Sequence, residues 1–153
     1  PYNIWLTKLK FHEHFYFALT LGFLMARQIE QQNWGNIDYI CALPLHPRRL
    51  SQRGYNQAQL LMSAVLSFSA SQWPIYQDLE RRKSTKPQTE LSRLERQLNT
   101  HNAFVCRRPI LGKSLLLIDD VITTGSSIKS ATTALKNAGA SQVFVACAAM
   151  RLL

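Results

Sequence analysis

The stretch LLLIDDVITTGSS, residues 115–127, carries the strongest structural signal in this chain. Four consecutive apolar residues, 115–118, are typical of a strand that is buried on both faces of a parallel sheet. Asp119 and Asp120 end the apolar run, and a turn rich in hydroxyl side chains follows them. Because ligands of such sheets bind beyond the carboxyl ends of the strands, the stretch predicts a ligand site at the acid pair.

The residues that follow predict a helix and a second strand. Ile128, Ala131 and Leu135 recur at helical spacing. Gly139 is typical of a helix end, and the apolar run 142–149 predicts the next strand. A strand, a helix and a strand of this combined length predict a right-handed crossover between two parallel strands.

The turn after the acids has the chemistry of a phosphate site. The first backbone N–H groups of a helix bind anions with the help of the helix dipole. Gly125 lets the backbone approach a ligand closely. The turn also offers four hydroxyl donors: Thr123, Thr124, Ser126 and Ser127. The two carboxylates repel a phosphate, but they accept hydrogen bonds from a diol or hold a divalent cation. A ribose 5-phosphate satisfies both halves of this pattern.

Two other phosphate-handling sites do not fit the sequence. A phosphatase of the haloacid dehalogenase type needs two acids separated by one residue, whereas Asp119 and Asp120 are adjacent. The run Gly112-Lys113-Ser114 is not a nucleotide-binding P-loop, because Arg107 occupies the place of the first glycine and a strand follows. A structural alternative stays open, in which the acids only cap the following helix.

Residues 119–127 resemble the phosphoribosyl pyrophosphate (PRPP) signature of type I phosphoribosyltransferases. Further motifs occur in the order seen in ComF competence proteins: Pro44-Leu45-His46-Pro47, Arg53-Gly54-Tyr55-Asn56-Gln57, Gln88, Arg96, Asn99 and Ala103-Phe104. The resemblance extends from Lys8 to Arg151. It implies an α/β fold of the type I phosphoribosyltransferase kind, with a mostly parallel central sheet, helices on both faces and a mobile flap at residues 80–102.

The same resemblance implies roles for individual residues. Asp119, Asp120 and Arg53 would be catalytic, and the two acids would also hold Mg²⁺. The expected PRPP-binding residues are Asp119, Asp120, Val121, Thr123, Thr124, Gly125, Ser126 and Ser127. A strand at residues 39–43 would lead into a loop, residues 44–57, that binds the pyrophosphate group. Arg53, Gly54 and Asn56 are its expected contributors.

Length and composition predict one globular domain over residues 1–153. The chain is 46% hydrophobic and 18% charged, which suits one ordinary core. Residues 8–33 form an apolar amino-terminal segment, and its most apolar part, residues 15–26, is too short to span a bilayer and predicts a core helix. Because the chain begins with Pro1, we expect it to be a fragment of a longer protein.

The cysteines indicate a reducing compartment. Cys41, Cys106 and Cys147 stand apart from one another, so they offer neither a disulfide framework nor the four ligands of a zinc site. ComF proteins usually carry an amino-terminal zinc ribbon, and this sequence has no paired cysteines for one. A cytoplasmic location follows as the expectation.

The net charge of +9 is concentrated in the middle of the chain. Residues 44–113 hold twelve basic and four acidic residues, a net charge of +8. Such clustering suits a polyanion, either the pyrophosphate of PRPP or a nucleic-acid backbone, although a solvated basic face is the simpler alternative. The residues predicted to bind nucleic acid are Arg81, Arg82, Lys83 and Lys86.

Two functions follow from these patterns. The first is a ComF-like competence protein with a PRPP site, which acts in natural transformation on the cytoplasmic side of the DNA-uptake machinery. Single-stranded DNA and proteins of that machinery would be its partners. The second is a phosphoribosyltransferase that moves phosphoribose from PRPP, with Mg²⁺, to a nitrogenous base or another acceptor.

Overall fold

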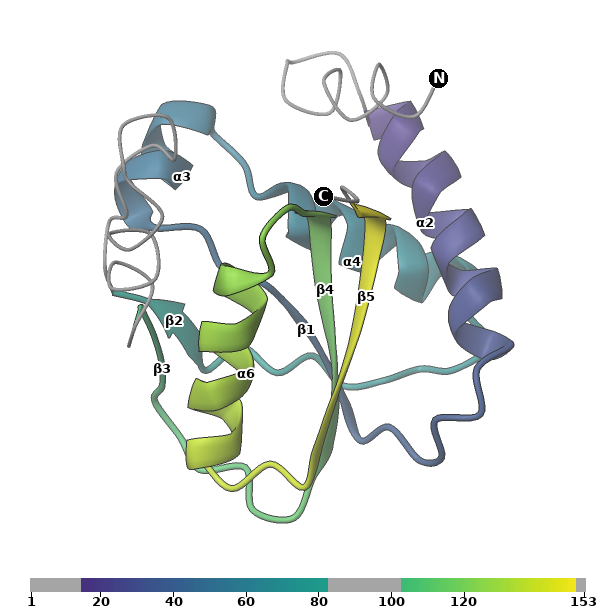
Figure 1. Cartoon of the computed structure of the whole chain (residues 1–153). Coiled ribbons are helices and arrows are strands. Elements are labelled where there is room, and N and C mark those ends of the chain that lie inside the picture. Colours follow the sequence, from purple (N-terminus) through teal and green to yellow (C-terminus); the bar gives the residue numbers. More distant parts are fainter. Residues whose placement is uncertain (1–14, 83–102, 151–153) are drawn as a thin grey trace.

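The computed structural model describes residues 15–82 and 103–150 (Figure 1). The elements in chain order are helix α2 (Phe15–Glu30), strand β1 (Tyr39–Ala42), helices α3 (Pro47–Arg53) and α4 (Gln57–Phe68), strands β2 (Leu79–Arg81), β3 (Phe104–Cys106) and β4 (Ser114–Ile122), helix α6 (Ser126–Asn137) and strand β5 (Gln142–Met150). The predicted strand, helix and strand after residue 114 are thus confirmed.

Strands β1, β4 and β5 form a parallel sheet in the order β1-β4-β5. β4 pairs with β1 as far as Ile118 and continues beside β5 as far as Ile122. It is therefore longer than the predicted strand and runs through the acid pair, because β5 supplies backbone partners there after β1 has ended. A separate antiparallel pair, β2 and β3, sets Arg81 opposite Phe104.

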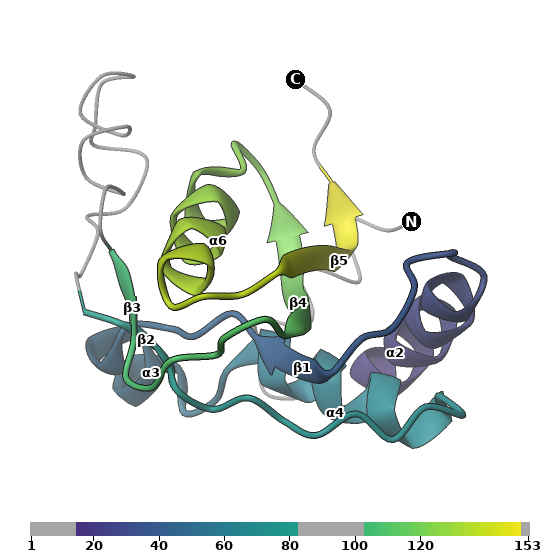
Figure 2. The ribbon, with the colours of Figure 1, turned by 90° about the horizontal axis from the view of Figure 1, so that it is seen from below.

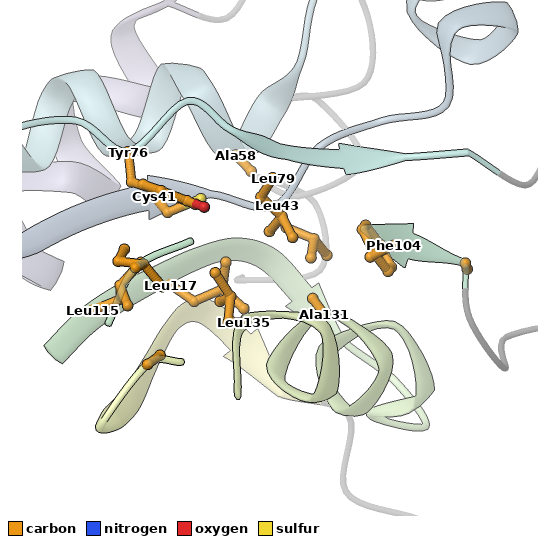
Figure 3. Close-up of a cluster of buried hydrophobic side chains, with 13 residues drawn as sticks. Cys41, Leu43, Ala58, Tyr76, Leu79, Phe104, Leu115, Leu117, Ala131 and Leu135 are labelled. Carbon is orange, nitrogen blue, oxygen red and sulfur yellow. The ribbon is translucent and has the colours of Figure 1, made fainter. Parts of the chain in front are cut away.

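Helices cover both faces of the parallel sheet (Figure 2). Leu115 and Leu117 of β4 belong to the core on the α6 side, which also holds Phe104 (Figure 3). Leu116 and Ile118 point the other way, into the core made with α2 and α4. This alternation is the period of an extended strand. It confirms the prediction of a central strand covered on both faces.

Helix α2 confirms the core helix that was predicted within the amino-terminal segment 8–33. Ala18, Leu21, Met25 and Ile29 are buried at helical spacing. Gly22 packs so closely on α4 that a Cβ atom built there would lie 2.3 Å from the Cβ of Ala64. In the described part of the chain, no helix is both long and apolar enough to cross a membrane.

The structure describes all of the first predicted loop, residues 44–57, and only the start of the second, residues 80–102. Residues 44–57 are not a simple loop, because helix α3 forms within them: Pro47 suits a first helical turn, and Gly54 ends the helix with a left-handed φ of 78°. Of the predicted flap, residues 80–102, Glu80 and Arg81 belong to β2. Residues 83–102, with Gln88, Arg96 and Asn99, lie outside the described residues.

The Gly112-Lys113-Ser114 run leads into β4, as the sequence indicated. Lys113 donates to Asp38 across 3.1 Å, and the same carboxylate accepts the backbone N–H of Ser114 at 2.9 Å. Both donors hold the pKa of Asp38 below its ordinary value, with the backbone bond as the larger cause. The lysine therefore fixes the start of β4 beside β1, and it lies at the opposite edge of the sheet from the acid pair.

Candidate functional site

Asp119 and Asp120 lie where β4 extends past the end of β1. Asp119 follows Leu117 by two residues in the strand, so it points to the α6 side, as Leu117 does. The carboxyl of Asp120 acts on that of Asp119 through its charge and through a side-chain hydrogen bond, and, after burial, both raise the pKa of Asp119. Asp119 accepts the N–H of Asp120 at 2.9 Å, and Asp120 accepts that of Val121 at 2.8 Å. These bonds stay within β4, and the residue that precedes α6 is Gly125. The acids therefore do not cap α6.

Asp119 is the more buried of the two acids, with 9% of its surface exposed. Burial is the main cause that raises its pKa to about 8, and the negative charge of Asp120 adds to the effect. The positive charge of Arg81 acts in the opposite direction. Burial therefore favours the neutral form of this carboxyl, which can donate a hydrogen bond as well as accept one.

The hydroxyl-rich turn opens directly into α6. Gly125 has a left-handed φ of 70°, and no side chain caps the helix in the part of the chain that the structure describes. Thr124 and Ser126 share a hydrogen bond of 3.0 Å between their hydroxyl groups. The first N–H groups of a twelve-residue helix thus meet a turn with exposed or half-buried hydroxyls. This arrangement suits a phosphate group.

The predicted pyrophosphate loop lies beyond the end of β1. Arg53 is the last residue of α3 and is half-buried, and Gly54 follows in a left-handed conformation. Asn56 is buried, and its side chain donates to the carbonyl of Leu43 and accepts the N–H of Ala58, both at 3.0 Å. Its amide therefore positions the start of α4 against β1. Contact of Arg53, Gly54 and Asn56 with a pyrophosphate stays a prediction.

Arg81 occupies a different place from the one its cluster suggested. It is half-buried, and its guanidinium lies 5.3 Å from the centre of the Phe104 ring. Arg82 is exposed, whereas Lys83 and Lys86 lie outside the described residues. Binding of nucleic acid by Arg81, Arg82, Lys83 and Lys86 stays a prediction.

Comparison with known proteins agrees with this geometry. Residues 78–152 match the phosphoribosyl transferase domain family. The DNA utilization protein YhgH of Escherichia coli O157:H7 is 36% identical over 110 residues, which cover 72% of this chain and 48% of that protein. Competence protein F of Haemophilus influenzae is 31% identical over 156 residues, which cover 95% of this chain and 66% of that protein. The chain belongs to the ComF family.

The solved structures confirm the fold of this ComF chain. The glutamine PRPP amidotransferase from B. subtilis superimposes with a TM-score of 0.55 at 19% identity, over 86% of this chain and 26% of that one. The fold is therefore that of the type I phosphoribosyltransferases, as predicted. The chain spans between about half and two thirds of the length of the curated relatives described above.

Cys147 is a residue at the ComF site that the sequence did not single out. It lies opposite Asp119 in the β4–β5 register, and it is half-buried. Burial raises the pKa of its thiol, and the negative charge of Asp119 adds to the effect. Paired residues of parallel strands point to the same face. The sequence predicted that Cys147 lies in a strand. Only the pairing of β4 with β5 shows that it lies beside Asp119.

The donor set of this ComF chain limits how a metal ion could be held. In residues 15–82 and 103–150, no three His, Cys, Asp or Glu side chains gather into a metal site. The carboxyl groups of Asp119 and Asp120 lie close enough for a side-chain hydrogen bond between them. Mg²⁺ commonly binds through one or two carboxylates together with waters and the phosphates of a ligand. The acid pair fits an ion that arrives with a phosphorylated ligand.

Proposed function

We propose that this chain is the PRPP-binding domain of a ComF competence protein. The observation that carries the proposal is the continuous path from β4 through the acid pair to the uncapped start of α6 behind Gly125. In this assignment Asp119 and Asp120 bind the ribose hydroxyls, and residues 123–127 bind the 5-phosphate. The buried Asp119 carboxyl suits a diol, because its protonated form both donates and accepts.

Mg²⁺ would be held by the acid pair together with the diphosphate oxygens of PRPP. When bound, the ion would neutralise charge on the diphosphate and make it a better leaving group. The chain itself contributes positioning: the turn fixes the phosphate end of the ligand, and the acids fix its ribose. Positioning of this kind is the larger part of catalysis for a reaction with little proton transfer.

A role in natural transformation is supported by the names of the relatives, which are a competence protein and a DNA utilization protein. The net charge of +9 also suits a nucleic-acid partner. In this proposal the chain handles single-stranded DNA on the cytoplasmic side of the membrane, with proteins of the uptake machinery as partners. The exposed Arg82 stays a candidate for DNA contact, together with Lys83 and Lys86.

The match to the phosphoribosyl transferase domain family supports a second function, transfer of phosphoribose to a nitrogenous base or another acceptor. In that reaction the bond between the anomeric carbon and the diphosphate breaks, the acceptor forms a new bond to that carbon, and the acceptor loses a proton. Charge that develops on the ribose would be stabilised by the carboxylates beside it.

Titration calorimetry with PRPP and Mg²⁺ tests the proposed site. Wild type is expected to bind, and Asp119→Asn with Asp120→Asn is expected to abolish binding. Asp78→Asn is a matched control, because this acid lies before β2 and pairs loosely with Arg108 at 3.8 Å. Equal PRPP affinity in the double variant and wild type would refute the assignment of the site.

A pyrophosphate-release assay then separates the two functions. Release that depends on an added base or other acceptor would make the protein a phosphoribosyltransferase. Binding without release, together with an affinity for single-stranded DNA that PRPP alters, would favour a PRPP-responsive competence module. The double Asp variant should leave DNA affinity nearly unchanged, because its substitutions lie in the PRPP site.

A further inference from the structure

An open groove of about 520 Å³ lies at the edge of the parallel sheet where its strands begin. It is lined by Tyr39 at the start of β1, by residues 75–78, and by residues 108–111 and Lys113, which connect β3 to β4. Asp119 and Asp120 lie near the other end of β4 (Figure 1). The groove is therefore separate from the proposed PRPP site, and the proposed function does not use it.

The walls of the groove are fixed by contacts within the chain. Tyr76 is 8% exposed, and its hydroxyl group donates to the carbonyl of Arg108 at 2.8 Å. Its ring also meets that of Tyr39 edge to face, with 6.2 Å between the ring centres. These contacts join the start of β1 to the β3–β4 connection. The groove thus keeps its shape without a bound partner.

Two exposed apolar side chains stand at the groove. Leu111 is 75% exposed and Ile75 is 44% exposed. The backbone on both sides of Leu111 is held in place, because Ile110 donates to the carbonyl of Ala138 at 2.8 Å and Gly112 to that of Gly139 at 2.9 Å. A rigid backbone loses little conformational freedom on association. A leucine held in water beside a preformed groove therefore indicates a contact surface for another protein.

The charges around this groove are balanced, unlike those of the chain as a whole. The net charge of +9 makes two copies of the chain repel each other. At the groove, however, acids match the basic residues one for one. Arg108 pairs with Asp78 at 3.8 Å, Lys113 with Asp38 at 3.1 Å and, beside the groove, Arg107 with Glu80. Two copies can meet at this edge without net repulsion.

We propose that the groove is the contact surface between two copies of this chain in a symmetric dimer. A two-fold axis brings the same surface of both copies together, so that each surface must be its own complement. This surface has both halves of each contact: a projecting leucine with an apolar hollow, and a guanidinium with a carboxylate. The Arg108 side chain is 81% exposed, and its 3.8 Å contact is too long for a hydrogen bond. Arg108 therefore pairs with the partner subunit's Asp78, and the two PRPP sites stay open at the far ends of the dimer.

Sedimentation equilibrium over a range of protein concentrations tests the dimer. Wild type is expected to show a reversible equilibrium between monomer and dimer. Leu111→Asp should raise the dimer dissociation constant about tenfold or more, because it puts a charge into the apolar hollow. Leu19→Asp is the matched control, since this leucine is 44% exposed on α2, away from the groove. Its dissociation constant should equal that of wild type.

A pair of charge variants tests the contact itself. Arg108→Asp and Asp78→Arg each place like charges opposite each other across the axis, so each alone should associate more weakly than wild type. An equimolar mixture of the two variants should form a heterodimer that is tighter than either homodimer, because both cross pairs then have opposite charges. Circular dichroism checks that each variant is folded.

Three results would overturn the proposal. The first is a wild type that stays monomeric up to about 1 mM, which would leave the groove to a different protein. The second is an equal loss of association in Leu19→Asp and Leu111→Asp, which would place the contact on α2. The third is a mixture of folded charge variants that associates no better than each variant alone.

Discussion

At the residue scale, Asp119 is a carboxyl group that the fold holds largely away from water at the end of β4. Its pKa rises to about 8 through burial and the charge of Asp120. The folded chain therefore keeps a proton that the unfolded chain releases near the ordinary pKa of about 4. By linkage, the contribution of Asp119 to stability is fully present below about pH 4 and is lost as the pH rises to about 8.

Asp119→Asn is expected to remove this pH dependence. Between pH 5 and pH 8 the free energy of unfolding of wild type should fall relative to the variant, by up to about 1.4 kcal/mol per pH unit. Urea denaturation at several pH values measures both proteins without ligand or Mg²⁺. Parallel curves for the two proteins would show that the carboxyl is already ionised in the folded state.

Gly125 joins β4 to α6 with a φ of 70°, a conformation that L side chains rarely adopt. An added Cβ atom meets no other atom within 4 Å, so the cost of Gly125→Ala is backbone strain alone, roughly 1 kcal/mol. We expect that loss of stability together with weaker ribose 5-phosphate binding, measured by urea denaturation and calorimetry. Gly35→Ala is the control, since its φ is 71° in equally open space. It should cost similar stability but leave the ligand affinity unchanged.

At the element scale, α2 and α4 pack on each other through Gly22 and Ala64. This contact closes the core on one face of the sheet, because both helices supply buried residues to it. The same core holds Trp34, which stacks on Phe144 of β5 at 5.2 Å. Small residues at the crossing thus set how closely α2 approaches α4.

Gly22→Ala should lower the free energy of unfolding by about 1–3 kcal/mol, since overpacking outweighs the better helix propensity of alanine. Thermal or urea unfolding measures the change. Adding Ala64→Gly removes the 2.3 Å contact and should recover part of the loss, although Ala64 backbone atoms at 3.0 and 3.1 Å remain close. A Gly22→Ala variant more stable than wild type would mean that the helices separate at no cost.

The sequence predicted those elements whose pattern is local and apolar. The order and the type of the elements β4, α6 and β5 were predicted, because their buried positions repeat at strand and helix periods. The end of β4 was not, because pairing with β5 carries the strand four residues beyond the apolar run. Helix α3 was missed, since none of its residues is buried and it therefore has no apolar stripe. The place of Arg81 was missed for another reason: it depends on the pairing with Phe104, and a run of basic residues gives no sign of which member turns inward.

At the scale of the whole molecule, the net charge of +9 is large for a chain of 153 residues. Part of the basic middle segment is neutralised within the fold, because Arg107, Arg108 and Lys113 each pair with an acid. Other basic residues, such as Arg48 and Arg82, are exposed. The attraction for a polyanion therefore comes from only a part of the charge count.

Arg82→Gln with Lys83→Gln is expected to weaken binding of a single-stranded oligonucleotide and to flatten its salt dependence. Each phosphate contact adds about 0.7 to the slope of log affinity against log salt, so the loss should be about 1.4. Fluorescence anisotropy at several salt concentrations measures the slope. An unchanged slope would identify these two residues as part of a solvated face. Arg81 is left intact, because it is half-buried over the Phe104 ring and its loss could disturb the fold.

Ser114 bonds to two segments that lie at very different distances from it along the chain. Its backbone N–H bonds to Asp38, 76 residues earlier, whereas its hydroxyl group meets that of Ser141, 27 residues later. Short closures form quickly, and distant strand pairings form slowly. During folding, the acids and the hydroxyl turn should therefore assemble before β1 arrives beside them. Affinity for PRPP would then be complete only at the last step of folding, when β1 joins the other two strands of the sheet.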